Sequence, residues 1–172
     1  MSHVIDSTLA IFRSQKGLAE RAFSQVTDEQ LHQALAPNTN CIAVIVKHMA
    51  GNMLSRWTDL FASDGEKPWR HRDNEFVDDV GSRDELLALW ERGWACCLAA
   101  IEALMPEDLS KNVPIRGEPH TVIRAIHREV SHYGYHVGQI VLIARILAGR
   151  NWTTLTVPPG GSEEYNRRVW KR

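Results

Sequence analysis

Apolar residues recur every three or four positions in four long segments of the chain, a spacing typical of helices that bury one face. The segments cover residues 5–24, 40–61, 82–105 and 121–147. In the second segment the apolar stripe consists of Ile42, Ile45, Val46, Met49, Met53 and Trp57. Four long helices without convincing strand pairs predict an all-α fold, and specifically a four-helix bundle.

Helix-start signals support this division of the chain. Thr27 is followed three residues later by Gln30, the capping-box pattern, and this predicts a short helix after the first long one. Ser82 and Glu85 have the same spacing at the start of the third long helix. Gly149 follows the fourth helix, in the place where glycine commonly ends one.

The segments between the long helices are polar. Residues 63–81 read as a loop, and the linker 107–119 predicts a small turn or hairpin around Gly117. Residues 162–172 can add one short helix. We expect a single domain over residues 1–172, but the long linkers leave simple hairpin connectivity and handedness open.

Charge and hydropathy limit the classes of partner. Twenty Lys and Arg residues against twenty-one Asp and Glu residues give a net charge of −1. That balance gives no electrostatic support for binding nucleic acid or an anionic membrane. The longest nearly uncharged stretch, residues 137–148, is too short to span a bilayer, and we see no secretory signal.

The cysteines indicate a reducing compartment. Cys41, Cys96 and Cys97 form an odd set with an adjacent pair, which is a poor disulfide framework. We therefore expect free thiols and a cytoplasmic location.

Two of the eight histidines carry the strongest chemical signal. His132 and His136 lie four residues apart, so both project from one face of the predicted fourth helix. Ile140 and Ile143 continue that face, which places the pair toward the interior. Two buried imidazoles side by side are costly unless something occupies the space between them, and a divalent metal does so well. Histidines that serve only as core residues are the competing interpretation.

A metal site needs a third ligand, and His48 is the best candidate. It lies within the second helix, on a face with Cys41 and Asn52 at the border of the apolar stripe. His127 is an alternative, but it precedes His132 by five residues and so faces a different direction. Three protein ligands would leave a position for water or substrate, the open arrangement of a catalytic site.

Other polar residues near these histidines have several possible roles. Glu129 precedes His132 by three residues, and it can be a ligand, a partner of a ligand or, the favoured interpretation, a surface carboxylate. Asn52 and Gln139 can orient a ligand imidazole through its other nitrogen. We expect the remaining histidines to be solvated: His3, His32, His71 and His120.

The chain resembles the DinB-like (YfiT-like) superfamily of metal-binding four-helix bundles, in a subgroup of mostly uncharacterised proteins. The resemblance rests on residues 42–52 (IAVIVKHMAGN) and 132–140 (HYGYHVGQI), and on the linkers 64–69 and 115–120. It implies an up-down-down-up bundle, often a homodimer, with a divalent ion of the nickel, zinc or iron type. Carried over by position, it implies the metal ligands His48, His132 and His136.

The resemblance also implies classes of activity. Characterised members include transferases and isomerases that use low-molecular-weight thiols such as bacillithiol, mycothiol or glutathione, and others resemble metal-dependent hydrolases. Our leading hypothesis is a thiol S-transferase that joins a small-molecule thiol to an electrophile. Cationic partners for a thiol that carries carboxylates are available, although surface charge is the favoured role of each: Arg56, Lys67, Arg70 and Arg72.

Two other hypotheses stay open. Metal-assisted hydrolysis needs a general base, and Glu129 is the only nearby carboxylate that the sequence offers. A non-enzymatic binding or interaction protein with a structural metal is the third hypothesis. Its six tryptophans could serve a dimer surface, although most of them are expected in the core.

Overall fold

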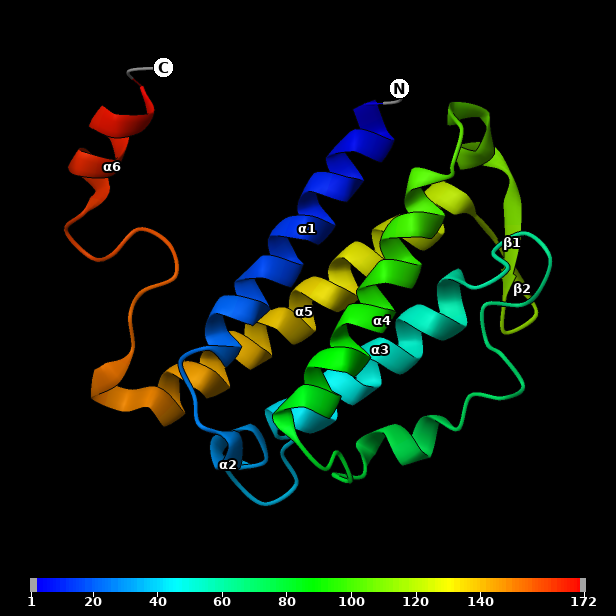
Figure 1. The fold of residues 1–172 in the computed structure, drawn as a ribbon. Helices are drawn as coiled ribbons and strands as arrows, with labels where there is room; N and C mark the ends of the chain where they lie inside the picture. Colours follow the sequence, from blue (N-terminus) through cyan, green and yellow to red (C-terminus); the bar gives the residue numbers. More distant parts are fainter. Residues whose placement is uncertain (1–2, 171–172) are drawn as a thin grey trace.

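The protein is mostly helical, as the computed structural model of residues 3–170 shows (Figure 1). This part of the chain contains six α-helices: α1 (His3–Phe23), α2 (Asp28–Leu31), α3 (Ile42–Trp57), α4 (Arg83–Glu102), α5 (Val122–Ala148) and α6 (Ser162–Val169). It also contains three 3-10 helices, η1 (Arg72–Phe76), η2 (Pro106–Ser110) and η3 (Gly149–Asn151). One antiparallel hairpin joins β1 (Asn112–Ile115) to β2 (Glu118–Thr121). The predicted helical character is confirmed.

The four long helices pack against one another around one hydrophobic core. Helix α3 packs on α4 and α1 packs on α5, while α1 also contacts α4 and α3 contacts α5. At the centre lie Phe12, Trp94 and Tyr133, whose ring centroids are 5.4–5.8 Å apart in tilted or edge-to-face pairs. Such aromatic contacts add to the burial of apolar area, so this cluster fixes how α1, α4 and α5 meet.

Helices α3 and α4 approach closely at Gly93. A Cβ atom at this position would lie 2.9 Å from the Cα of Ala50 and 3.2 Å from the sulfur of Met53. Any larger residue would therefore push the two helices apart. This contact sets the spacing between α4 and α3, the helix that carries His48.

The predicted helix starts are found, with one difference. Thr27 forms a complete capping box with Gln30 at the start of α2. Ser82 caps α4 by accepting a hydrogen bond from the backbone N–H of Glu85, but the Glu85 side chain accepts from the backbone N–H of Gly81. Only half of the second predicted capping box therefore forms.

Helix α3 ends four residues earlier than the periodicity predicts. Thr58 has an extended backbone with ψ at 130°, and Asp59 adopts a positive φ of 49°, so the chain leaves the helix after Trp57. The loop expected over residues 63–81 holds the short helix η1, so that prediction was only partly right.

The hairpin expected around Gly117 is present. Its two turn residues, Arg116 and Gly117, have φ values of 55° and 75°, the left-handed region that a tight two-residue turn requires. The carboxylate of Asp64 accepts hydrogen bonds from both backbone N–H groups, at 2.8 and 2.7 Å. These bonds tie the segment after α3 to the hairpin that leads into α5.

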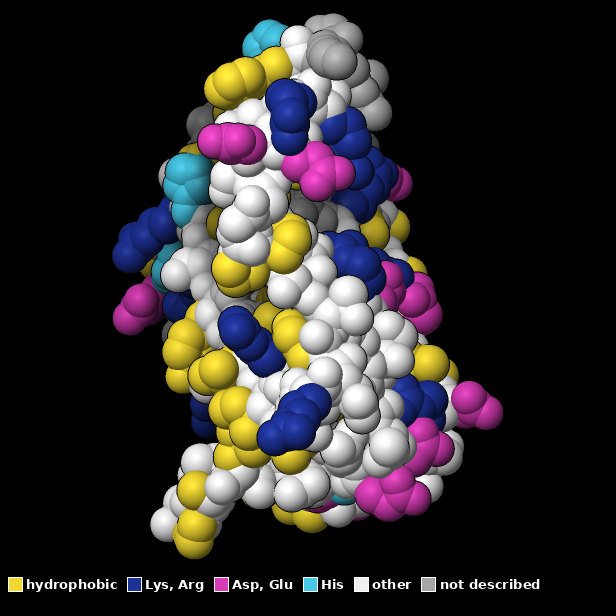
Figure 2. Space-filling model, turned by 90° about the vertical axis from the view of Figure 1, so that its left-hand side faces the viewer, with side chains coloured by type: hydrophobic (Ala, Val, Ile, Leu, Met, Phe, Trp, Pro, Cys, Tyr) yellow, Lys and Arg dark blue, Asp and Glu magenta, His cyan; other side chains and the backbone are white. Residues whose placement is uncertain are grey.

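The C-terminal helix lies apart from the other helices (Figure 1), and none of its residues is buried. Figure 2 shows the left-hand side of the view in Figure 1, where acidic and basic side chains both occur among hydrophobic ones. Among the helices of residues 3–170, none combines the length and the apolar character that crossing a bilayer requires.

Candidate metal centre

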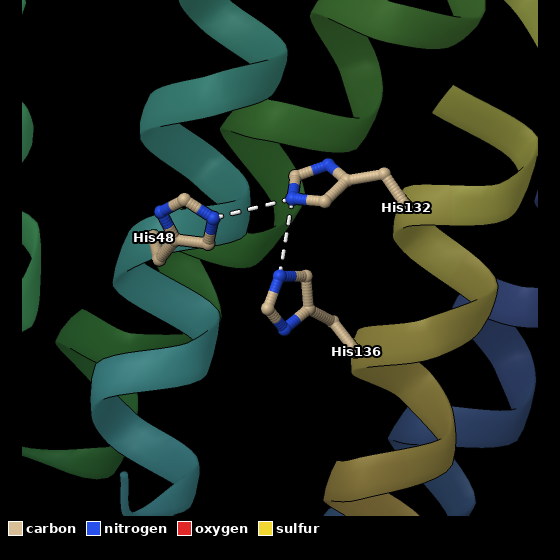
Figure 3. Close-up of side chains that lie close together, drawn as sticks. All are labelled: His48, His132 and His136. Atoms are coloured by element: carbon tan, nitrogen blue, oxygen red, sulfur yellow. Dashed lines mark hydrogen bonds between the residues drawn. The ribbon is translucent and has the colours of Figure 1, made fainter. Parts of the chain in front are cut away.

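Three imidazoles from two helices face one another (Figure 3). His48 comes from α3, and His132 and His136 come from successive turns of α5. The Nε2 atom of His132 lies 3.2 Å from Nε2 of His48 and 3.1 Å from Nε2 of His136. One nitrogen from each ring fits within a sphere where all separations are below 4.8 Å, which suits binding of a single ion. His127, the alternative third ligand, is exposed and lies outside this cluster.

A hydrogen-bond acceptor holds the other nitrogen of each ring. His48 Nδ1 lies 2.8 Å from Glu75 Oε2, His132 Nδ1 lies 3.1 Å from Glu129 Oε2, and His136 Nδ1 lies 2.9 Å from Gln139 Oε1. Because these oxygens accept, each Nδ1 carries the proton and donates it. The three Nε2 atoms then present lone pairs to one another, an arrangement that a cation between them stabilises.

The ionisation of these groups agrees with that assignment. Burial opposes the charged form of Glu75, but hydrogen bonds from Arg70 and His48 prevail and lower the pKa of its carboxyl group. Burial likewise opposes ionisation of Glu129. The hydrogen bond from His132 and the charge of Arg56 prevail, however, and lower the pKa of its carboxyl group. Burial, together with the other two histidines, lowers the pKa of His136 to about 4, so its ring is neutral near pH 7, as a ligand requires.

Each of the two carboxylates behind the histidines is paired with a buried arginine. Glu75 accepts from Arg70 Nε at 2.7 Å and from Arg70 Nη2 at 2.8 Å. Glu129 accepts from Arg56 Nε at 3.2 Å. The surface roles favoured for Glu129, Arg56 and Arg70 are therefore wrong: their side chains are 1–3% exposed, and an opposite charge makes the burial of each tolerable. The surface role favoured for Lys67 is wrong as well, because Lys67 is buried and its Nζ donates to the backbone oxygen of Asp64 at 2.6 Å.

Within residues 3–170 Asn52 makes no hydrogen bond to an imidazole, contrary to expectation. Its Oδ1 accepts from the hydroxyl of Tyr133 at 3.1 Å, and that hydroxyl accepts from Trp57 Nε1 at 2.9 Å. Asn52 thus belongs to a buried polar network beside the site. Gln139, in contrast, occupies the place expected of it, next to His136.

His120 was expected to be solvated and is in fact buried. It lies on β2 with 5% of its surface exposed, and its Nδ1 is 3.1 Å from the backbone oxygen of Glu118. The hairpin packs against α5, which explains this burial. His120 is not part of the histidine cluster.

Glu75 is the main functional residue that the sequence analysis missed. It belongs to η1, within the polar stretch that carries no helical periodicity, so nothing in the pattern placed it near His48. In the structure η1 packs on α3, and the neighbouring Phe76 ring stacks on His48 with centroids 5.0 Å apart.

A cavity of about 170 Å³ opens beside the cluster. His48 and His132 line it together with Asn52, Glu129 and five arginines. An ion held by the three histidines would therefore face a small, strongly basic space.

Comparison with known proteins gives one family. The family described as "Protein of unknown function (DUF1572)" matches residues 2–161. The chain belongs to the DUF1572 family. The match includes all three histidines and both carboxylates behind them, so the centre lies wholly within the part shared with the family.

The fold of this DUF1572 protein has a counterpart among solved structures. The crystal structure of a conserved protein from Enterococcus faecalis matches with a TM-score of 0.67 and 18% sequence identity, over 87% of this chain and 100% of that chain. At that identity the likeness concerns the fold alone. No curated protein matches the sequence significantly.

Proposed function

We propose that this DUF1572 protein binds one divalent metal ion, of the nickel, zinc or iron type, through Nε2 of His48, His132 and His136. The observation that carries the proposal is the fixed direction of the rings. All three Nδ1 atoms have acceptors, at 2.8–3.1 Å, so all three Nε2 lone pairs are left for a cation, and one nitrogen of each ring lies within 4.8 Å of the others. The resemblance of the same residues to the DinB-like superfamily supports the assignment independently.

We further propose that the protein is a metal-dependent thiol S-transferase. Arg70 and Arg56 balance the charges of Glu75 and Glu129, so the positive charge of an ion would be left to attract an anionic ligand from outside. When bound, a divalent ion supplies Lewis-acid chemistry, which favours the thiolate form of a small thiol. Thiolate is the competent nucleophile for attack on an electrophilic carbon.

The proposed reaction balances without an oxidant or reductant. The thiol loses its proton to solvent, its sulfur forms a new bond to the electrophilic carbon, and the leaving group departs with the electron pair of the broken bond. The basic cavity next to His48 and His132 would hold a carboxylate of the thiol.

Hydrolysis with Glu129 as general base is less well supported. One oxygen of Glu129 accepts from His132 Nδ1, and the other lies 3.2 Å from Arg56 Nε. These contacts lower the pKa of the carboxyl group and leave little tendency to take a proton. A hydrolase would need a base from elsewhere.

A non-enzymatic role is the competing hypothesis. In that case the ion would be structural, and its coordination sphere would contain no exchangeable water. The opening of the cavity beside the histidines favours the enzymatic alternative.

We also propose an up-down-down-up order for α1, α3, α4 and α5, a homodimeric assembly and a cytoplasmic location. The pairing of α3 with α4 across the long connection 58–82 supports the helix order. Exposed Leu142 and Ile146 on α5 give a second copy an apolar surface to cover. The three cysteines are free, as expected in a reducing compartment.

Elemental analysis of the purified protein tests the metal site. We expect about one divalent ion per chain in the wild type, since three histidines make one site, and loss of that ion in His48→Ala and His136→Ala. His127→Ala is the matched control, because His127 lies on the same helix but is exposed and outside the cluster. A wild-type protein that stays metal-free after incubation with nickel, zinc and iron(II) would overturn the metal site.

The activity is tested with the metal-loaded protein. We expect the wild type to consume an electrophile such as 1-chloro-2,4-dinitrobenzene, in the presence of a thiol, faster than the uncatalysed reaction does, and His136→Ala to give only the uncatalysed rate. Failure with bacillithiol, mycothiol, glutathione and cysteine alike would reject the transferase while leaving the metal site in place.

A further inference from the structure

The cavity beside the histidine cluster has an excess of positive charge. Five arginines line it, against one carboxylate, that of Glu129. Two further carboxylates, Glu66 and Glu75, pair with Arg70 and Arg116 from outside the cavity. Five positive charges against three negative ones leave two unbalanced, before any metal ion is counted.

The arginines of the cavity are not equivalent. Arg70 is fully engaged: Glu75 accepts from its Nε and Nη2, and Glu66 lies 3.5 Å from its Nη1. Arg116 bonds Glu66 through Nε. Arg70 therefore has little capacity for a ligand, whereas Arg116, whose side chain is 55% exposed, engages only its Nε within residues 3–170.

Arg56 is different, because it is buried but only some of its hydrogen-bond donors have acceptors. Its side chain is 2% exposed, and its Nε pairs with Glu129. Its Nη1 has no hydrogen-bond partner anywhere in residues 3–170. A buried guanidinium group with so few acceptors is costly, and Arg56 is one of the residues that line the cavity. An anion bound there to the part of the guanidinium group that faces the cavity would lower this cost.

The fold makes room for this guanidinium group. A Cβ atom at Gly65 would lie 2.4 Å from Arg56 Nη1, so the arginine occupies this place because Gly65 has no side chain. Asp64, next to Gly65, fixes the local backbone by bonding the hairpin turn. The position of Arg56 thus depends on two segments that are distant in sequence, residues 64–65 and the hairpin turn 116–117.

Two more arginines lie on the exposed side of the cavity. The Arg72 guanidinium stands 5.1 Å from the centre of the Phe76 ring. The Arg128 side chain is 46% exposed, and its Nε is 3.5 Å from Glu129 Oε1. Both can turn their donors toward a ligand that enters from solvent.

We propose that this cavity binds the carboxylate or phosphate group of a small anionic substrate, with Arg56 as the buried anchor and Arg72 and Arg128 at the opening. This inference rests on the proposed function, because it names the substrate class of the same centre. His48 and His132 line the cavity, so a substrate held by its anionic end has its other end near the histidines. The small volume, about 170 Å³, admits such a group with few further atoms, since drug-sized ligands occupy about 300–1,000 Å³.

Isothermal titration calorimetry with inorganic phosphate and with succinate tests the proposal, on both metal-loaded and chelator-treated protein. We expect the wild type to bind at least one of the two in both forms. Arg56→Lys should weaken binding by about tenfold or more, because an ammonium group cannot replace the planar pair of donors. The double variant Arg72→Gln/Arg128→Gln, altered only at exposed positions, should also weaken it. Arg92→Gln, an exposed arginine on α4, is the matched control and should bind as the wild type does.

Comparison of the two anions identifies the ligand chemistry. Tighter binding of phosphate indicates a phosphate ester, and tighter binding of succinate indicates a carboxylic acid. The proposal is overturned if neither anion binds the wild type, or if both bind the Arg56→Lys and double variants as tightly as the wild type. Metal content measured on the same samples separates the two hypotheses. Anion binding by a protein that takes up no metal would reject the metal centre alone, whereas metal uptake without anion binding would reject the anion site alone.

Discussion

Glu75→Gln is the sharpest test of how the histidine cluster is held. Glu75 is buried on η1 and accepts three hydrogen bonds, from His48 Nδ1 at 2.8 Å and from Arg70 Nε and Nη2 at 2.7 and 2.8 Å. Glutamine has almost the same shape, but it has one acceptor oxygen and one NH₂ group. At least one of the three donors would therefore face another donor.

The expected effect on stability follows from this count. A hydrogen bond to a charged group contributes about 1.5–3 kcal/mol, so the loss of one such bond should lower the free energy of unfolding by a similar amount. The effect on the metal has a separate cause, because the His48 ring would lose the carboxylate that makes it more basic. Removal of such a partner costs about 10–100-fold in metal affinity, or about 1.4–2.8 kcal/mol.

The two effects are measured separately. A competition titration against a chromophoric chelator gives metal affinity, and urea denaturation of the metal-free protein gives stability. Glu66→Gln is the control, since Glu66 lies 3.5 Å from Arg70 but does not contact a histidine. Equal metal affinities of Glu75→Gln and Glu66→Gln would show that the contact between Glu75 and His48 has no role in metal binding, and would refute the reasoning.

Two further predictions concern the frame around the site. Gly93→Ala should lower the free energy of unfolding by about 1–3 kcal/mol, seen as a lower melting temperature, because its Cβ would lie 2.9 Å from the Cα of Ala50. Tyr133→Phe should cost about 1–3 kcal/mol in urea denaturation, because the buried Trp57 Nε1 loses its acceptor and Asn52 Oδ1 loses its donor. An unchanged stability in either variant would mean that the helices adjust there at little cost.

The parts of this protein that follow from local sequence could be predicted well. The helical pattern placed the long helices within a few residues, and the four-residue spacing of His132 and His136 put them on one face. Gln139 lies three residues beyond His136 on the same helix, so its place next to that ring also follows from spacing. The end of α3 was missed, since it depends on the positive φ of Asp59, which no periodicity signals.

The parts that depend on contacts between distant segments could not be predicted. Glu75 reaches His48 only because η1 folds back onto α3, and its polar surroundings in the sequence resemble a loop. The burial of Arg56 depends on Glu129, 73 residues away, and on the absence of a side chain at Gly65. Glu129 did carry a local signal, because a carboxylate three residues before an inward-facing histidine shares its face of the helix.

The chain of contacts from His48 through Glu75 to Arg70 has a consequence for how this family can diverge. Replacement of Arg70 alone would leave the buried carboxylate of Glu75 without its arginine, and replacement of Glu75 alone would leave a buried cation. Each single substitution would therefore give a destabilised protein. The two positions are therefore expected to change together among relatives, or to be inherited together with the histidine. A family member with an apolar residue at one of these two positions should also lack the charged residue at the other. That pattern would distinguish members that keep the histidine centre from those that have lost it.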